Sequence, residues 1–230
     1  MKKFRKLAAL AMAALMVLSL TACSAVVDEV VNKLTEGQMK ALVQGNLDEL
    51  YLGTVDEEYL KSVNSTAEEA QQFHQEMMEL KAEDFAYYFG IEFLTDDLRA
   101  EITDLCDQIY SKAKYTVGEG TVVDDTTVSV EVTVYSIDIY QQMVDDIEEY
   151  MSDFYAKYTE DVVNAMDDAA YVAYDAEWAG LVIDLCREKL ATLSHGEART
   201  LGLQVKLEND IWCLSDAALT GFDALVITYP

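Results

Sequence analysis

The chain of 230 residues has very little proline and little positive charge. Its one proline is Pro230 and its ten glycines are scattered, so no proline-rich or glycine-rich linker divides it. The sequence has 16 lysines and arginines and 43 aspartates and glutamates, which gives a formal net charge of -27. Because binding to phosphate backbones depends on basic counter-charge, this balance excludes nucleic acid as a partner. Since 51% of the residues are hydrophobic, we expect a buried core beneath an acidic, solvated exterior.

Residues and motifs that commonly carry catalysis are also scarce. His74 and His195 are the two histidines, and neither lies in a recognisable serine, cysteine or metal motif. The sequence contains no GxSxG, HExxH or glycine-rich phosphate loop, and its adjacent acidic pairs do not fit the DxDxDG loop that binds calcium. We therefore expect no catalytic residue, no cofactor and no metal site. His74 is expected on the flank of a helix, and His195 is expected to cap the end of one.

The cysteines give little support for a metal centre. Cys106, Cys186 and Cys213 form no CxxC pair and have no histidine nearby in the sequence, which argues against zinc. Cys106 and Cys186 each end an Asp-Leu-Cys triplet on an expected helix, so they form the pair to test for a disulfide. The alternative is three buried, unpaired thiols.

The N-terminus has the organisation of an export signal. Four basic residues lie among the first six positions, and an uncharged apolar stretch follows over residues 7–20. The sequence Leu20-Thr21-Ala22-Cys23 resembles a lipobox, which implies cleavage before Cys23 and acylation of that cysteine. We therefore expect a lipoprotein signal peptide over 1–22, lipid attachment and a short tether over 23–36, and a membrane-anchored extracytoplasmic body. The alternative is an uncleaved signal anchor.

The hydrophobic periodicity predicts an α+β fold. Helical spacing begins near Val26, and helix starts are expected at Asn46, Thr66 and Thr95. Strict alternation predicts one antiparallel hairpin over 115–135, with a bulge at Gly118-Glu119-Gly120, and a second over 201–214. Helices are expected between the hairpins over 141–193, and an edge strand over 224–229. The predicted architecture is a single α+β domain over 37–230, in which several helices pack on a curved antiparallel sheet.

Three stretches resemble a family of Gram-positive lipoproteins of unknown function. They are Val43–Asp48, Tyr115–Glu119 together with Val128–Asp138, and Leu203–Trp212. The family is similar to the nuclear-transport-factor-two-like, or cystatin-like, superfamily. This resemblance implies a curved sheet that encloses a pocket against helices, but it implies no single function, because that scaffold hosts binding modules, assembly domains and isomerases.

Aromatic residues provide the candidate binding site. Tyr87 and Tyr88 lie in an aromatic cluster at one expected junction, and Tyr171, Tyr174 and Trp178 follow at helical spacing. We expect Tyr87, Tyr88 and Trp178 at the rim of a pocket for an unknown small molecule, peptide or protein. Two alternatives stay open at this point. One is an isomerase-like or hydrolase-like enzyme that uses His74 or a buried carboxylate with a tyrosine partner, and the other is a structural protein that dimerises through an open sheet face.

Overall fold

The computed structural model describes residues 35–209 and 211–229, which form two compact units. The described residues of 1–74, 114–135 and 197–226 form one, here called the sheet unit, and those of 75–113, 136–196 and 227–230 form the other, here called the helical unit. The chain changes unit five times, after positions 74, 113, 135, 196 and 226. The leader and Cys23 lie outside the described residues, and the single domain over 37–230 stays a prediction.

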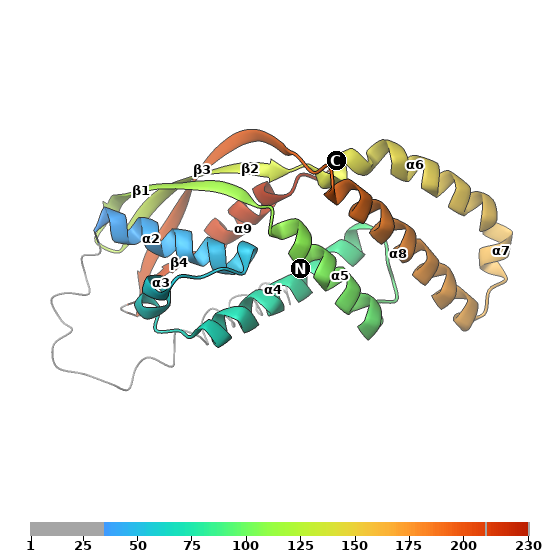
Figure 1. Ribbon diagram of the computed structural model, residues 1–230, viewed down its shortest axis with the longest axis horizontal. Coiled ribbons are helices and arrows are strands. Elements are labelled where there is room, and N and C mark those ends of the chain that lie inside the picture. The colour runs from blue at the N-terminus through green and yellow to red at the C-terminus, as the bar shows by residue number, and fades with distance from the viewer. Residues whose placement is uncertain (1–34, 210, 230) are drawn as a thin grey trace. The chain divides into compact units, whose positions relative to one another are not determined.

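The α+β fold class is confirmed by a curved four-stranded antiparallel sheet in the order β1-β2-β3-β4 (Figure 1). The strands are β1 (Lys114–Asp124), β2 (Thr127–Ile137), β3 (His195–Glu208) and β4 (Ile211–Leu214). The helices of the sheet unit are α2 (Glu36–Leu47), the π-helix η1 (Asp48–Leu52), α3 (Glu57–Ser62), the first part of α4 (Ala67–Tyr88) and α9 (Asp216–Val226).

Both predicted hairpins are present. In β2 the residues of the Val128–Val134 alternation point to one buried face, as expected from a period of two. The pairing of β1 with β2 shifts register between Val117 and Gly120, which confirms the predicted bulge. In the second hairpin Val205 pairs with Leu214 and Glu208 with Ile211. The long helical segment between the hairpins is also confirmed.

Helices cover the apolar face of the sheet. α2 runs along β1 (Figure 1), and Phe222 of α9 is fully buried. The ring centroid of Phe222 lies 5.2 Å from that of Tyr51 and 5.5 Å from that of Tyr115. The Tyr51 hydroxyl donates a hydrogen bond to Asp223 at 3.0 Å. Aromatic packing therefore connects η1, β1 and α9 within the sheet unit.

The helical spacing expected from Val26 to Leu34 lies outside the described residues, whereas the helix start expected at Asn46 differs from the structure. Thr35 and Gln38 form a reciprocal capping box, and α2 continues past Asn46 to Leu47. The predicted start at Asn46 is therefore wrong, and the Asn46 amide donates to the carbonyl of Leu42 within the helix at 3.2 Å. The predicted starts at Thr66 and Thr95 are confirmed, because each side chain accepts a hydrogen bond from the backbone of the first turn.

The C-terminal apolar stretch also differs from its prediction. Residues up to Val226 continue α9 instead of forming an edge strand. Ala218, Phe222 and Val226 are the buried residues of this helix, and their spacing of four places them on one face. Only Ile227 makes a β-bridge, a parallel one to Ile137. The helical period is concealed at this end of α9 because residues 224–227 form a continuous apolar run.

Two glycines of α2 lie in contrasting surroundings, so the same substitution is expected to change stability in opposite directions. A Cβ on Gly45 would lie 2.1 Å from the Tyr59 ring, whereas a Cβ on Gly37 would have no neighbour within 4 Å. We expect Gly45→Ala to lower the free energy of unfolding by about 1–3 kcal/mol through overpacking. Gly37→Ala should raise it by about 0.5 kcal/mol, because alanine has the better helix propensity. Urea denaturation of both variants measures the two changes, and a loss of stability in both would contradict this packing.

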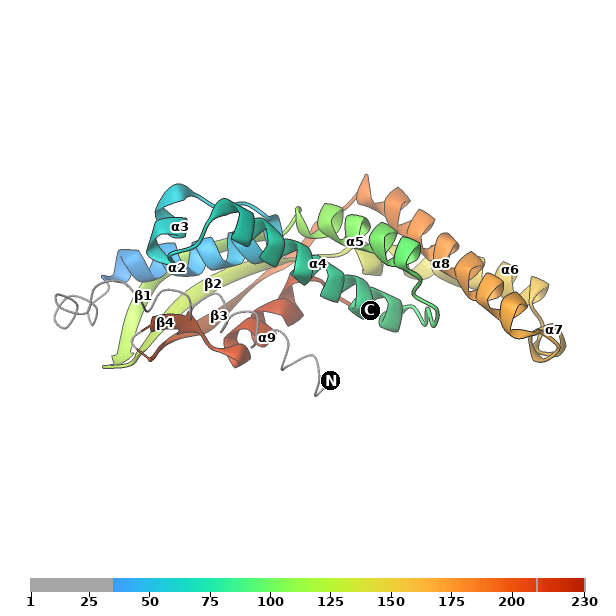
Figure 2. The ribbon, with the colours of Figure 1, turned by 90° about the horizontal axis from the view of Figure 1, so that it is seen from below.

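The helical unit is built from the rest of α4, α5 (Asp96–Tyr110), α6 (Ile139–Lys157), α7 (Glu160–Asn164) and α8 (Asp168–Leu190). α6 and α8 lie side by side and are joined through α7 (Figures 1 and 2). The side chains of Met143, Ile183 and Cys186 are buried in this unit, the Cys186 thiol contacts the Met143 sulfur, and Lys189 pairs with Asp146. No helix of the described residues is both long and apolar enough to cross a membrane.

The three cysteines of the described chain are free thiols, so the candidate bridge between Cys106 and Cys186 is not formed. Both of these thiols are buried in the helical unit, and the Cys186 thiol donates to the Met143 sulfur at 3.3 Å. Burial raises the pKa of Cys106 to about 12 and also raises the pKa of Cys186. Both groups are therefore protonated apolar side chains at neutral pH.

Candidate functional site

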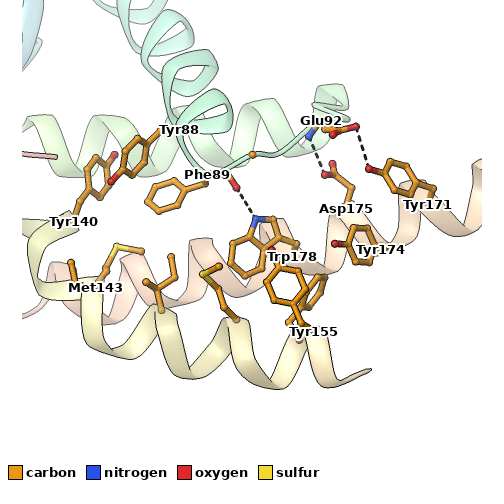
Figure 3. Close-up of a pocket in the computed structure, with 15 residues that line it drawn as sticks. Tyr88, Phe89, Glu92, Tyr140, Met143, Tyr155, Tyr171, Tyr174, Asp175 and Trp178 are labelled. Carbon is orange, nitrogen blue, oxygen red and sulfur yellow. Dashed lines mark hydrogen bonds between the residues drawn. The ribbon is translucent and has the colours of Figure 1, made fainter. Parts of the chain in front are cut away.

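A cavity of about 430 Å³ lies within the helical unit (Figure 3). Its walls come from α6, α8 and the end of α4 with the segment that follows α4. Eight of the fifteen lining residues are aromatic, four have aliphatic or thioether side chains, two are acidic and one is glycine. They are Tyr88, Phe89, Gly90, Glu92, Tyr140, Met143, Val144, Ile147, Met151, Phe154, Tyr155, Tyr171, Tyr174, Asp175 and Trp178.

Helical spacing brings the walls together. On α6, Met143, Ile147 and Met151 follow each other at intervals of four, so they share one face of that helix. On α8, Tyr171, Asp175 and Trp178 are spaced by four and three, which places them on one face too. In Figure 3, Tyr88 and Tyr140 lie at one end of the cavity, whereas Tyr171 and Tyr174 lie at the other.

The third wall depends on how α4 ends. Gly90 adopts a left-handed conformation with φ of 68°, and the Ile91 amide donates to the Ala86 carbonyl at 2.8 Å. This is a Schellman-type C-terminal cap, which favours glycine because a Cβ is strained in that conformation. The residues after Gly90 then run along α8. Just before the cap, the Phe89 carbonyl accepts a hydrogen bond from the Trp178 indole at 2.7 Å.

Asp175 attaches this segment to α8. Its side chain is buried, with 3% of the residue exposed, and it accepts the Glu92 amide at 3.0 Å and the Phe93 amide at 2.8 Å. Each carboxylate oxygen therefore accepts one backbone N–H. The Tyr171 hydroxyl reaches the Glu92 carboxylate at 3.4 Å. One end of the cavity is thus polar and acidic.

The phenols of Tyr140, Tyr171 and Tyr174 at the cavity are neutral. Burial raises the pKa of Tyr140 far above its usual value, with smaller contributions from neighbouring thiols and tyrosines. Burial also raises the pKa of Tyr171 and of Tyr174, and in each case the negative charge of Glu92 contributes in the same direction. At neutral pH these side chains present uncharged rings and hydroxyl groups.

Two of the three residues predicted at the rim line the cavity, and the third does not. Tyr88 and Trp178 line the cavity, whereas Tyr87 does not and is 90% exposed. No residue of the lining belongs to a strand, so this cavity differs from the pocket between sheet and helices that the family resemblance implies. Asp175 and Tyr140 were not predicted. The sequence did contain a signal for Asp175, because this acidic residue lies at helical spacing between the aromatic residues Tyr171 and Trp178.

A second group of polar side chains lies in the sheet unit. Glu49 of η1 is buried and accepts a hydrogen bond from the Tyr59 hydroxyl at 2.5 Å. Burial raises the pKa of Glu49, while the Tyr59 hydrogen bond and the charge of His74 oppose that shift. The His74 ring lies on a half-buried helix position, with Nδ1 3.1 Å from the Leu50 carbonyl. This group contains the buried carboxylate and tyrosine partner that an enzymatic alternative requires.

The other histidine does not cap a helix. α8 ends at Leu190, and His195 begins β3. Its Nε2 lies 2.8 Å from the Lys112 carbonyl, so the predicted capping role is wrong. The error arose because the helix ends several residues earlier than the apolar pattern suggested. Across the described residues no group of three or more histidine, cysteine, aspartate or glutamate side chains is arranged to hold a metal ion.

The comparisons with known proteins give one informative likeness. No family model matches the sequence, and no curated protein matches it. Among solved structures, the chain is similar to the crystal structure of a "putative lipoprotein (ycdA)" from Bacillus subtilis, with a TM-score of 0.57 and 14% sequence identity. The match covers 84% of this chain and 59% of that one, so this chain spans less than two thirds of its length. At this identity the likeness shows a shared fold.

Proposed function

We propose that the chain is a lipid-anchored extracytoplasmic protein that binds a small organic ligand without transforming it. The observation that carries the proposal is the cavity of about 430 Å³ in the helical unit. Its volume lies in the range typical of small-molecule sites, and such sites combine apolar and aromatic walls with a few polar groups. Here the polar groups are Asp175, Glu92 and the tyrosine hydroxyls at one end.

The anchoring part of the proposal depends on the leader. The basic start, the apolar stretch over 7–20 and the cysteine at position 23 fit a lipoprotein signal. The likeness in fold to a protein described as a lipoprotein of Bacillus subtilis supports the same location. Because the chain is strongly acidic, its surface would be repelled by anionic headgroups, and acyl chains would supply the attachment.

A thermal-shift screen tests the binding part of the proposal. The probes are water-soluble fragments in three sets: neutral, cationic and anionic. We expect at least one set to raise the Tm, since a ligand that binds the folded state alone stabilises it. Val144→Phe fills the cavity from α6 and should weaken every hit by about tenfold or more, because a bound fragment and the new ring would overlap.

The matched control is Val172→Phe. Val172 is half-buried like Val144, but it lies on α8 outside the cavity lining. This variant should keep the hits of the unmodified protein. The proposal is wrong if no set of fragments shifts the Tm, or if Val144→Phe binds the hits as well as Val172→Phe does.

A further inference from the structure

The cavity has an unusual balance of charge and aromatic surface. From that balance we infer that it takes a small organic cation, namely an alkylated ammonium group that carries an apolar substituent. The inference rests on the proposed function and names its ligand class. It depends on three features of the lining: negative charge without positive charge, a high density of neutral rings, and a buried carboxylate whose lone pairs are partly occupied.

The first feature is the sign of the charge. Glu92 and Asp175 line the cavity, and none of the lining residues in the described chain is a lysine, arginine or histidine. Asp175 is 3% exposed, so its charge is poorly screened by water. An anionic ligand would meet uncompensated repulsion in this site. A cation would gain a favourable Coulomb interaction with both carboxylates.

The second feature is the ring density. The Phe154 centroid lies 5.0 Å from that of Tyr174 and 5.4 Å from that of Trp178. Tyr171 stacks on Tyr174 at 5.6 Å, and Tyr155 adjoins Phe154 at 5.9 Å. The faces of such rings carry negative electrostatic potential, which attracts cations within about 6 Å, and groups of them are the usual site for quaternary ammonium compounds. Figure 3 shows Tyr171, Tyr174 and Trp178 on the same helix as Asp175, with Tyr155 on the facing helix.

The third feature decides which cation fits. Both oxygens of Asp175 already accept backbone amides, and the Trp178 indole already donates to the Phe89 carbonyl. A primary ammonium brings three N–H donors that would each need an acceptor in the site. A quaternary ammonium brings none, and its methyl groups can lie directly on the rings. The lining therefore favours an alkylated ammonium group over a strongly hydrated one.

The test compares cations with uncharged molecules of the same shape. Calorimetric titration of the full chain uses choline against 3,3-dimethylbutanol, and benzyltrimethylammonium against neopentylbenzene. We expect each cation to bind about tenfold more tightly than its neutral partner, the ratio given by a desolvated cation–π and carboxylate interaction. Phosphatidylcholine vesicles form a further arm. Competition by these vesicles with a bound cation would identify a lipid headgroup as the source of the same ammonium group.

Two variants separate the contributions of the lining. Tyr155→Leu keeps apolar surface but removes a ring, and Glu92→Gln keeps hydrogen bonding but removes a charge. Each should weaken cation binding by about threefold to tenfold and leave the neutral partner unchanged. The matched controls are Tyr87→Leu and Glu148→Gln. Both residues are exposed and lie outside the lining, so neither change should affect either ligand.

The outcomes separate this inference from the proposed function. Equal binding of cations and neutral partners would overturn the cation assignment but keep a ligand site in the helical unit. The same conclusion follows if only neutral or anionic fragments bind. If the controls weaken cation binding as much as the lining variants do, a general effect of surface charge is responsible and the inference is wrong. If no fragment of any charge binds, both proposals fail.

Discussion

Replacement of Cys23 by alanine is expected to reduce incorporation of labelled palmitate to background. The thiol at position 23 is the attachment point that the lipobox resemblance identifies, and no other side chain of the leader offers one. A second variant, in which a cleavable secretory leader without the cysteine replaces 1–23, should move the protein into the soluble fraction. Without acyl chains, an acidic surface has no attraction to anionic headgroups. Metabolic labelling and membrane fractionation measure the two effects.

Cys213→Ala is the control for the labelling experiment. Cys213 is a half-buried thiol of β4 in the folded body, and its replacement should leave labelling and fractionation unchanged. Full labelling of the Cys23→Ala protein would show that the anchor has been assigned to the wrong residue. Continued membrane association of the second variant would point to attachment through the body instead of the lipid.

Asp175→Ala is expected to lower the free energy of unfolding by about 3 kcal/mol, since two hydrogen bonds to a buried carboxylate are lost. The backbone amides of Glu92 and Phe93 would lose the group that holds their segment against α8. The cavity would then lose its acidic wall, so ligand binding should weaken together with stability. Chemical denaturation measures the first effect, and the Tm shift with a cationic fragment measures the second.

The same helix supplies the control. Asp184 lies nine residues further along α8 with its side chain 81% exposed, and its carboxylate forms a distant ion pair with Arg187 at 3.8 Å. Asp184→Ala removes an identical charge and should have little effect on stability or binding. If both substitutions lower the free energy of unfolding by the same amount, Asp175 does not organise the cavity wall.

Local patterns predicted the elements well where one face is buried and the other is exposed. The alternation in β2 and the capping residues Thr66 and Thr95 each correspond to an observed strand or helix start. Prediction failed at the end of α9, where the continuous apolar run over 224–227 conceals the helical period. The division into two units was not predictable, because each unit joins segments that are far apart in the sequence.

The candidate site was predictable only in part, and the failure at Tyr87 has a geometric reason. Tyr87 and Tyr88 are neighbours in sequence, but consecutive side chains of a helix diverge by about 100°. Tyr88 therefore faces the cavity while Tyr87 is exposed to solvent. Nothing in the sequence states which of the two faces of α4 meets α6 and α8. The role of Asp175 depends on the path of the segment after Gly90, which is a tertiary feature.

The bridge between Ile137 and Ile227 connects two residues of the helical unit that are 90 positions apart, and the Thr228 amide also donates to the Ile137 carbonyl at 3.1 Å. While the chain is being synthesised, Ile137 emerges long before its partner. The helical unit therefore cannot complete its fold until residues near 227 are available. Such a delay would fit the proposed export, in which the polypeptide passes a secretion channel unfolded and folds afterwards.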